Sequence, residues 1–597
     1  MTMPSALRSF AWRLAGTLLA PAVVAAQPLP PNLPHPSPDV PWIASLHADP
    51  GEAPSRAQSL ARSMGPGTTV VDRLRAMGRV GAAGAAKAPE SPAPLPFDAA
   101  RDPLAEAVRD WPDVLAGLPP RTLLGGEARE EVARLVRETR NARRLCRDGL
   151  GAKAAAIDPG RLLSRAIEAT SSPDDEAGWR DADESVDRAS MLAGLGILAR
   201  AAQQFRDFAR RTELPPILWQ ADTPEGLIVV DLGRRDDRRI LGPFLLVVDG
   251  GGNDRYEFTG TPPSGRTSLL IDLAGNDHYL SRDSGADPST GVLGCGALWD
   301  AGGDDAYQGG AFAQGAALGG AALLVDESGD NRFDAEGFAQ GFAMNGWALV
   351  VTGPGRDRHL ARTHAQGSAG PGGVAFLVDE GGDDEYVLAS DRIVKPSAQL
   401  PGRNASLGQG SGAGLRARGE GDRHRPGGLG ALIELGGDDR YRADVFAQGA
   451  GLLGGAGVLV DLGGSDLREG AWYVQGAAAH GGAGILVDLG EGRDTYRASH
   501  STSIAAAHDR ALGVLHDDGG DDDYRLGDLG FGAAHDGGVA WFGDRGGSDR
   551  FLVESARCRA FGTAWRTDPD ARRLRFANVG RFDSVAVPPC RSRESAP

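Results

Sequence analysis

Acidic residues recur along the second half of the chain at a spacing that could hold cations. In most units of 26–27 residues a short apolar run ends in an acid, and a second acid follows five residues later. The pairs are Asp249 and Asp254, Asp272 and Asp277, Asp300 and Asp305, Asp379 and Asp384, Asp461 and Asp466, Asp517 and Asp522, and Asp544 and Asp549. Stacked carboxylates repel one another unless a cation such as Ca²⁺ lies between them. The alternative is that each aspartate accepts hydrogen bonds from turn N–H groups and faces water.

A column of histidines and aspartates near the end of the repeats is the second candidate site. Eight or nine residues before the closing acids of three consecutive units stand His480, then His508 and Asp509, then His535 and Asp536. Imidazole and carboxylate groups suit a transition metal, held by His480, His508 and His535, or acid–base catalysis by His508, Asp509, His535 and Asp536. The alternative is that the end of the repeat array is polar because it is less buried. His480 is offset by one residue from the other two histidines, which could turn its ring to the opposite face.

The repeat unit itself predicts the elements that position these residues. The apolar run is typical of a strand, the Gly/Asp segment of a turn, and an aromatic residue such as Tyr279 or Tyr307 begins a second strand. A third segment contains Ala-Gln-Gly, and its glutamines form a column predicted to be a structural amide ladder: Gln314, Gln340, Gln366, Gln448 and Gln475. A unit this short must bury its apolar face against its neighbours, and it is too short for a propeller blade. The sequence therefore predicts a mainly β protein, a parallel β-solenoid of about 11–12 coils over residues 227–555, preceded by a small α-helical domain.

The turn sequence Asp-x-Gly-Gly-x-Asp-x-Tyr resembles that of RTX-type calcium-binding repeats. The resemblance covers about nine residues of each unit and departs from the RTX nonapeptide Gly-Gly-x-Gly-x-Asp. RTX repeats place oxygen ligands between successive coils, so the resemblance implies Ca²⁺ as a cofactor held by the paired aspartates.

The remaining segments set the expected domain boundaries. Residues 1–26 have basic residues, an apolar core and a small-residue cleavage site, which predicts a signal peptide and an exported protein that is periplasmic, secreted or on the cell surface. Residues 27–100 are rich in Pro and Ala and are interpreted mostly as a linker, with one short helix near Arg56–Met64. Residues 101–215 are interpreted as the helical domain, 389–430 as a basic insertion and 556–597 as a tail. No later segment is long and apolar enough to be transmembrane. We expect the solenoid to fold without the residues that precede Glu213.

The four cysteines fit disulfides in an oxidising compartment. Cys558 and Cys590 are predicted to pair within the tail. A Cys146–Cys295 bond would need a specific docking of two domains that the sequence does not reveal.

Composition and motifs leave three classes of function. A formal charge of −17 disfavours nucleic acid as a partner. The first class is a non-catalytic binding or scaffold protein of the cell surface or periplasm, with a glycan or another envelope component as its partner. The others are a carbohydrate-active β-helix enzyme, a polysaccharide lyase or hydrolase, and a metallo-hydrolase centred on His480, His508 and His535. No nucleophile elbow, Walker loop or His-Glu-x-x-His motif occurs, which favours the non-catalytic class.

Overall fold

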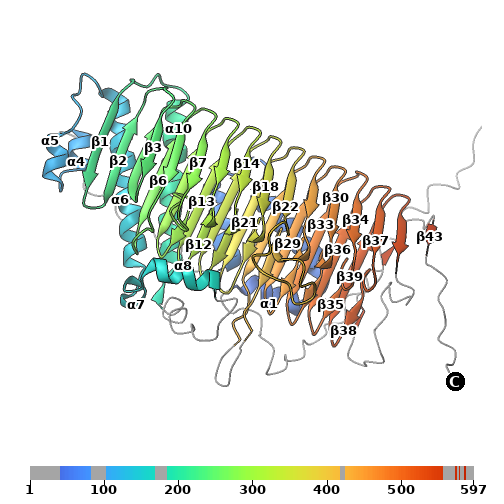
Figure 1. Ribbon diagram of the computed structural model, residues 1–597. Helices are drawn as coiled ribbons and strands as arrows, with labels where there is room; N and C mark the ends of the chain where they lie inside the picture. The colour runs from blue at the N-terminus through green and yellow to red at the C-terminus, as the bar shows by residue number, and fades with distance from the viewer. Residues whose placement is uncertain are drawn as a thin grey trace, which may run out of the picture.

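The computed structural model describes residues 40–81, 102–168, 185–416 and 424–554, and three short strands between 572 and 586. The predicted signal peptide and the predicted Cys558–Cys590 pair lie outside the described residues. The chain forms a parallel β-solenoid of about 11 turns with helices along one of its sides (Figure 1). The predicted fold class is confirmed.

The coils contribute strands to a long side and a second side, and from β8 (Gly291–Val292) onward also to a third side. The long side contains β1 (Leu218–Thr223), β2 (Gly226–Asp231), β4 (Phe244–Asp249), β6 (Thr267–Asp272), β9 (Cys295–Asp300), β13 (Ala321–Asp326), β17 (Trp347–Thr352), β21 (Val374–Asp379), β25 (Leu429–Glu434), β29 (Ala456–Asp461), β33 (Ala483–Asp488), β36 (Leu512–Asp517), β39 (Val539–Asp544), β41 (Arg572–Arg573) and β42 (Ala577–Asn578). The second side contains β3 (Arg238–Leu241), β5 (Arg255–Phe258), β7 (His278–Ser281), β10 (Ala306–Gln308), β14 (Arg332–Asp334), β18 (Arg358–Ala361), β22 (Glu385–Leu388), β26 (Arg440–Arg442), β30 (Leu467–Gly470), β34 (Thr495–Ala498), β37 (Asp523–Leu526), β40 (Arg550–Val553) and β43 (Ser584–Ala586).

The third side is made of very short strands in three sheets. The longest contains β8 (Gly291–Val292), β12 (Ala316–Leu318), β16 (Phe342–Met344), β20 (Ser368–Ala369), β24 (Ser411–Ala413), β28 (Gly451–Leu452), β32 (Ala478–Ala479), β35 (Ala507–His508) and β38 (Ala534–His535). The two smaller sheets contain β11 (Ala311–Ala313), β15 (Gly337–Ala339) and β19 (Thr363–Ala365), and β23 (Ala405–Gly408), β27 (Val445–Ala447) and β31 (Trp472–Val474).

Neighbouring coils pair residue for residue, so each position of the repeat becomes a column through the molecule. Asp272 pairs with Asp300 at the end of the long side, and Tyr279 pairs with Tyr307 on the second side. Because parallel strands in register bring equivalent side chains to the same height, the spacing seen in the sequence becomes a spatial ladder.

The glutamine column lies inside the solenoid, and it forms the predicted amide ladder over Gln314, Gln340 and Gln366 only, because Gln448 and Gln475 donate to backbone oxygens instead. Gln340 Nε2 donates to Gln314 Oε1 at 3.1 Å, and Gln366 Nε2 donates to Gln340 Oε1 at 3.2 Å. Gln409 belongs to the same column, and its Nε2 donates to the backbone oxygen of Tyr386 at 2.9 Å. The repeat spacing in the sequence did not predict Gln409 as a member of this column, because Gln409 lies within the insertion.

The step of 55 residues between Asp379 and Glu434 contains insertions rather than a lost coil. β21 pairs directly with β25, and Asp379 lies opposite Glu434. β23 and β24 supply the third side of this coil, and longer loops flank them on both sides. At the other end of the array, β41, β42 and β43 pair with the last full coil, so the segment predicted to be a tail contributes strands.

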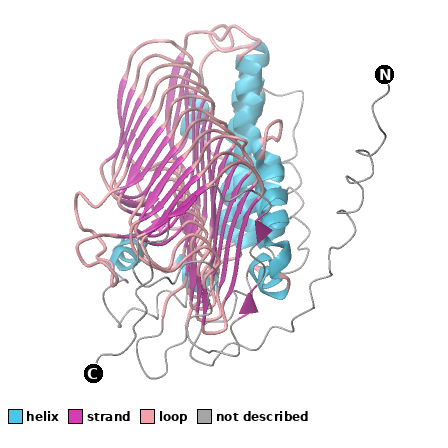
Figure 2. Cartoon of the chain, turned by 90° about the vertical axis from the view of Figure 1, so that its right-hand side faces the viewer, coloured by secondary structure: helices cyan, strands magenta, loops and turns pink. Residues whose placement is uncertain are grey.

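The strands of the long side are buried on both faces. On β13, Leu323 and Val325 face outward and share an apolar cluster with Leu195 of α10 (Arg188–Ala209), whereas Leu324 faces inward and packs in the cluster of Tyr307. Strands covered on both faces read as continuous apolar runs, which explains the runs in the sequence. Figure 2 shows the long helices lying against this side of the solenoid.

The helices pack on the solenoid, and most of them form a layer over its long side. They are α1 (Pro41–Ala48), η1 (Pro50–Glu52), α2 (Ala53–Met64), α3 (Val70–Gly81), α4 (Pro103–Ala107), α5 (Pro112–Ala116), α6 (Gly126–Asp148), α7 (Ala152–Ala155), α8 (Pro159–Glu168) and α10. α6 and α10 contact strands from β4 to β17, while α1 and α2 contact β29, β33 and β36. Among the described helices none is both long and apolar enough to cross a membrane.

The N-terminal region holds more helix than the sequence predicts. The short helix expected near Arg56–Met64 corresponds to α2, further helices lie within residues 41–81 of the segment interpreted as a linker, and the helical region over 101–215 shares its core with the solenoid. The buried face of α2 includes Ala57 and Ala61, small residues that give a weak apolar periodicity in a Pro- and Ala-rich segment.

Covalent and ionic links join the two layers. A disulfide connects Cys146 of α6 to Cys295 of β9, with Cα atoms 6.5 Å apart. Arg206 of α10 and Arg210, the residue that caps this helix, pair with Glu327 at 2.8 and 2.6 Å. The docking that this disulfide needs is the packing of α6 on the long side. The sequence did not predict this packing, because it depends on tertiary contacts.

Candidate functional site

The closing acids at the ends of the long-side strands face the inside of the solenoid. Asp300 Oδ1 accepts the N–H of Gly302 at 2.8 Å, which is the bond of an Asx turn, and its Oδ2 accepts the hydroxyl of Tyr279 from the preceding coil at 2.5 Å. The same tyrosine bond recurs between Tyr256 and Asp272 at 2.6 Å. The closing acids thus connect each turn to the neighbouring coil.

The second acids clamp the stack in the same interior. Asp305 Oδ1 accepts the backbone N–H of Asp277, the equivalent residue of the preceding coil, at 2.6 Å. This bond recurs from coil to coil at distances between 2.5 and 3.3 Å, as from Asp237 to Asp254 and from Asp522 to Asp549.

The structure brings all the predicted calcium-site aspartates into these two columns. They are Asp249, Asp254, Asp272, Asp277, Asp300, Asp305, Asp379, Asp384, Asp461, Asp466, Asp517, Asp522, Asp544 and Asp549, and all of them are buried. The alternative, aspartates that accept turn N–H groups and face water, is therefore right about the hydrogen bonds and wrong about the exposure. The aspartates accept these bonds while they are buried inside the solenoid.

A partly exposed ladder runs beside them and was missed in the sequence. The residue before the second acid accepts a backbone N–H from the next coil, as Asp304 Oδ1 does from Asp330 at 3.0 Å and Asp438 Oδ1 from Ser465 at 2.8 Å. The two ladders point in opposite directions along the solenoid, so each turn is bound to both of its neighbours.

Burial leaves one oxygen of most second acids without a partner. Among the described residues no hydrogen-bond donor faces Oδ2 of Asp305, Asp357 or Asp384. Desolvation by burial, with the charge of neighbouring acids, raises the pKa of Asp384 to about 8, of Asp357 to about 9 and of Asp305 to about 10. Carboxyl oxygens of Asp305, Asp300 and Asp277 lie within 4.8 Å of one another, close enough for neighbouring carboxyls to share a proton after small rotations.

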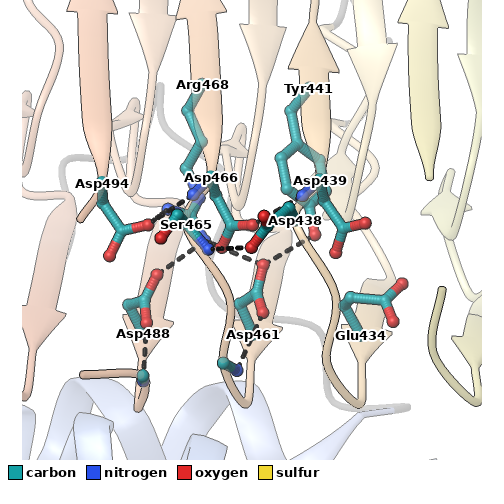
Figure 3. A network of polar contacts seen from close by, with 12 residues as sticks. Glu434, Asp438, Asp439, Tyr441, Asp461, Ser465, Asp466, Arg468, Asp488 and Asp494 are labelled. Carbon is teal, nitrogen blue, oxygen red and sulfur yellow. Dashed lines mark hydrogen bonds and ion pairs between the residues drawn. The ribbon is translucent and has the colours of Figure 1, made fainter. Parts of the chain in front are cut away.

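In the tyrosine column an arginine twice replaces the aromatic residue and supplies the missing cation. Arg468 is fully buried, and its Nη2 lies 2.8 Å from Asp461, 2.8 Å from Asp466 and 2.7 Å from Asp488 (Figure 3). Arg239 makes the corresponding contacts with Asp231 at 2.8 Å and with two further aspartates at 3.0 Å. The sequence indicates both arginines, because each is a basic residue at a position where the other repeats have an aromatic one.

One coil loses the hydroxyl and the acid together. Phe333 stands in the tyrosine column, and the closing position that it faces is Thr352 instead of an acid. The Thr352 hydroxyl donates to Asp379 Oδ2 at 2.8 Å. His359 follows in the aromatic column, stacked 4.6 Å from Phe333, with its Nε2 3.8 Å from Asp379 Oδ2. The paired change supports the interpretation that each tyrosine serves the acid of the next coil.

These observations bear on the calcium that the RTX resemblance implies. Apart from Asp544, whose Oδ2 has no hydrogen-bond partner among the described residues, the closing acids have one oxygen on a turn N–H and the other on a tyrosine, arginine or threonine group. Each second acid has one oxygen on a backbone N–H. Calcium takes about six to eight oxygen ligands, and a coil of this kind offers fewer carboxylate oxygens that are not already bonded. The geometry favours protons and guanidinium groups as the compensating charges, and calcium stays a prediction.

The structure assembles the histidine and aspartate column at the corner after β32, β35 and β38. His508 pairs with His535, and their ring centroids lie 5.0 Å apart. His480 Nδ1 lies 2.6 Å from Asp509 Oδ2, and His535 Nδ1 lies 2.8 Å from Asp536 Oδ2. All five side chains are partly exposed. The one-residue offset places His480 in the column of the two aspartates instead of turning it away.

The insertion forms a groove that the sequence did not predict. The loop before β23 and the edge of β22, β26, β30 and β34 enclose a cavity of about 560 Å³. Its lining includes Arg403, Arg442, Asp444, Glu469 and His500. Arg403 pairs with Asp444 at 3.2 Å. The basic character of the insertion pointed to this region, but two of the lining acids, Asp444 and Glu469, come from other coils. Arg418 and Arg423 of the insertion lie outside the described residues.

Comparison with known proteins adds no name to this site. No protein-family model matches the chain, and no curated protein or solved structure is similar to it. Fold and site together define a β-solenoid protein with an internal acid ladder and a helical layer.

Proposed function

We propose that this protein is an exported, non-catalytic β-solenoid that serves as a rigid scaffold of the cell surface or periplasm and binds a glycan. The observation that carries the proposal is the groove beside the insertion. It is the place where the coil departs from its repeat, and there arginines and carboxylates line a cavity of about 560 Å³.

The groove has the chemistry that a polyhydroxylated chain needs. Arg403 and Arg442 offer N–H donors, and Asp444 and Glu469 offer acceptors. His500 lines the groove, and its ring stacks with that of Trp472, with ring centroids 6.1 Å apart. The stacked rings add a flat apolar surface for a sugar ring.

The interior supports the scaffold part of the proposal. The acid, tyrosine and glutamine columns bond to one another from coil to coil, so these repeated polar residues hold the solenoid together instead of presenting a reaction centre. The disulfide between Cys146 and Cys295 supports export, because such bonds persist in oxidising compartments.

Affinity electrophoresis with polygalacturonate and with a neutral glucan tests the glycan proposal. We expect the protein to bind at least one of these probes and an Arg403→Ala, Arg442→Ala variant to bind at least about tenfold more weakly, because several charge-assisted hydrogen bonds are lost. Arg332→Ala is the matched control, an exposed arginine on the same side of the solenoid but outside the groove.

Two outcomes would count against the proposal. Equal binding by the double variant and the wild type would move the glycan away from the groove. Release of new reducing ends or unsaturated sugars from either probe would favour the polysaccharide lyase or hydrolase class instead.

A further inference from the structure

We propose that His508, Asp509, His535 and Asp536 bind a transition metal ion, and that His480 positions Asp509 for this role. The site goes beyond the proposed glycan binding and lies outside the residues that line the groove. It differs from the sequence expectation, in which all three histidines are ligands.

The backbone sets the spacing of the four ligands. β35 and β38 pair in parallel, with Ala507 opposite Ala534 and His508 opposite His535. The next residue in each coil, Asp509 or Asp536, has a positive φ of 52° or 48°, which turns the chain at the corner. Two successive coils thus present the same His-Asp pair at one height of the ladder.

The ligand atoms are close enough to share one ion. Each of the four side chains offers an atom within 4.8 Å of the others. Ligands about 2.1 Å from one zinc ion lie at most ~4.2 Å apart, so small side-chain rotations complete the approach. The side chains have room to rotate because they are partly exposed, and the same exposure gives an ion a path into the site. Two imidazoles and two carboxylates suit zinc, cobalt or nickel better than Ca²⁺.

His480 occupies the position of a second ligand shell. Its Nδ1 lies 2.6 Å from Asp509 Oδ2, whereas His508 Nε2 lies 3.5 Å from Asp509 Oδ1. One carboxylate therefore connects the two imidazoles. Groups that orient a ligating carboxylate change metal affinity without touching the ion.

The competing explanation is that the histidines and aspartates only pair with one another at a polar end of the array. Under that explanation the cluster would bind no stoichiometric metal. Zinc titration of the untagged, chelator-stripped full chain by calorimetry separates the two. We expect one ion per chain for the wild type and no stoichiometric zinc for a His508→Ala, His535→Ala variant.

The controls assign the roles. His480→Ala should weaken zinc binding about 10- to 100-fold but preserve its stoichiometry. His278→Ala, a histidine outside both the cluster and the groove, should bind zinc as the wild type does. Cobalt provides a second readout, since the wild type should give visible absorption bands of a nitrogen- and oxygen-ligated ion that the double variant lacks.

Absence of stoichiometric zinc in the wild type, or equal zinc affinity in the double variant, would overturn the proposal. Circular dichroism of the double variant establishes that it is folded. Polysaccharide binding by the same variant should be unchanged, so failure of the metal site and failure of the glycan proposal are distinguishable.

Discussion

At the scale of single residues, the interior of this solenoid is a problem of charge compensation. Tyr256 and Tyr279 each donate to an acid of the next coil, whereas Arg468 adds a full positive charge, and Thr352 removes an acid where Phe333 has no hydroxyl. Burying an isolated carboxylate is costly unless it is paired or protonated. A tyrosine hydroxyl, an arginine and the loss of the acid thus offset this cost in three chemically different ways.

Replacement of Arg468 tests this account directly. Arg468→Met removes the cation that, among the described residues, alone pairs with Asp461, Asp466 and Asp488, while keeping similar bulk. We expect a loss of about 3–5 kcal/mol in the free energy of unfolding. Arg468→Tyr should lose less, because its hydroxyl can donate to Asp488 as Tyr441 donates to Asp461 at 2.8 Å. Urea unfolding followed by circular dichroism measures both.

The control for this series is a surface arginine, Arg356→Met, which is largely exposed and should change stability little. If Arg468→Met and Arg468→Tyr lost equal stability, the tyrosine and arginine would not be serving the same acids.

At the scale of elements, the helices and the long side depend on each other. Val325 and Val351 face outward from neighbouring strands, and Trp347 Nε1 donates to the backbone oxygen of Arg188 in α10 at 2.8 Å. Without the helices this sheet would expose a continuous apolar face, which marks an aggregation site in a soluble protein.

Removal of the helices should therefore aggregate the solenoid. A chain that starts at Glu213 loses α1 to α10 and the partner of Cys295, and we expect it to elute in the void volume on gel filtration and to bind a hydrophobic dye. This reverses the expectation from the sequence that the solenoid folds alone. A Cys146→Ala, Cys295→Ala chain that keeps the helices is the matched control and should stay monodisperse, with stability reduced by about 2–4 kcal/mol. A soluble truncated chain with a β-type spectrum would restore the original expectation.

The same dependence explains what the sequence could and could not predict. The acid and aromatic spacing predicted the solenoid and its register, because a parallel stack converts sequence period directly into columns. His508 and His535 were predicted as neighbours for the same reason. The packing of α6 that brings Cys146 to Cys295, and the groove between Arg403 and other coils, depend on contacts between segments with no shared period.

At the scale of the whole molecule, the buried acids make stability depend on pH. Desolvation raises the pKa of Asp277 to about 8, of Asp357 to about 9 and of Asp439 to about 9, far above their values in an unfolded chain. The folded chain therefore holds more protons than the unfolded chain between about pH 4 and about pH 9, and stability falls as pH rises through that window.

Thermal melts with millimolar calcium and with chelator, at about pH 6 and about pH 9, test the predicted pH dependence of stability and the calcium prediction together. If protons compensate the acids, the melting temperature should fall from about pH 6 to about pH 9, and calcium should change it little at either pH. If calcium occupies the ladder, it should raise the melting temperature most at about pH 9, where the carboxylates are ionised, because a ligand that binds only the folded chain stabilises it. Arg468→Met should steepen the fall in the first case, since the loss of its guanidinium leaves Asp461, Asp466 and Asp488 to be neutralised by protons alone. A melting temperature that is independent of both pH and calcium would contradict either form of compensation and would require the aspartates to remain ionised in the interior.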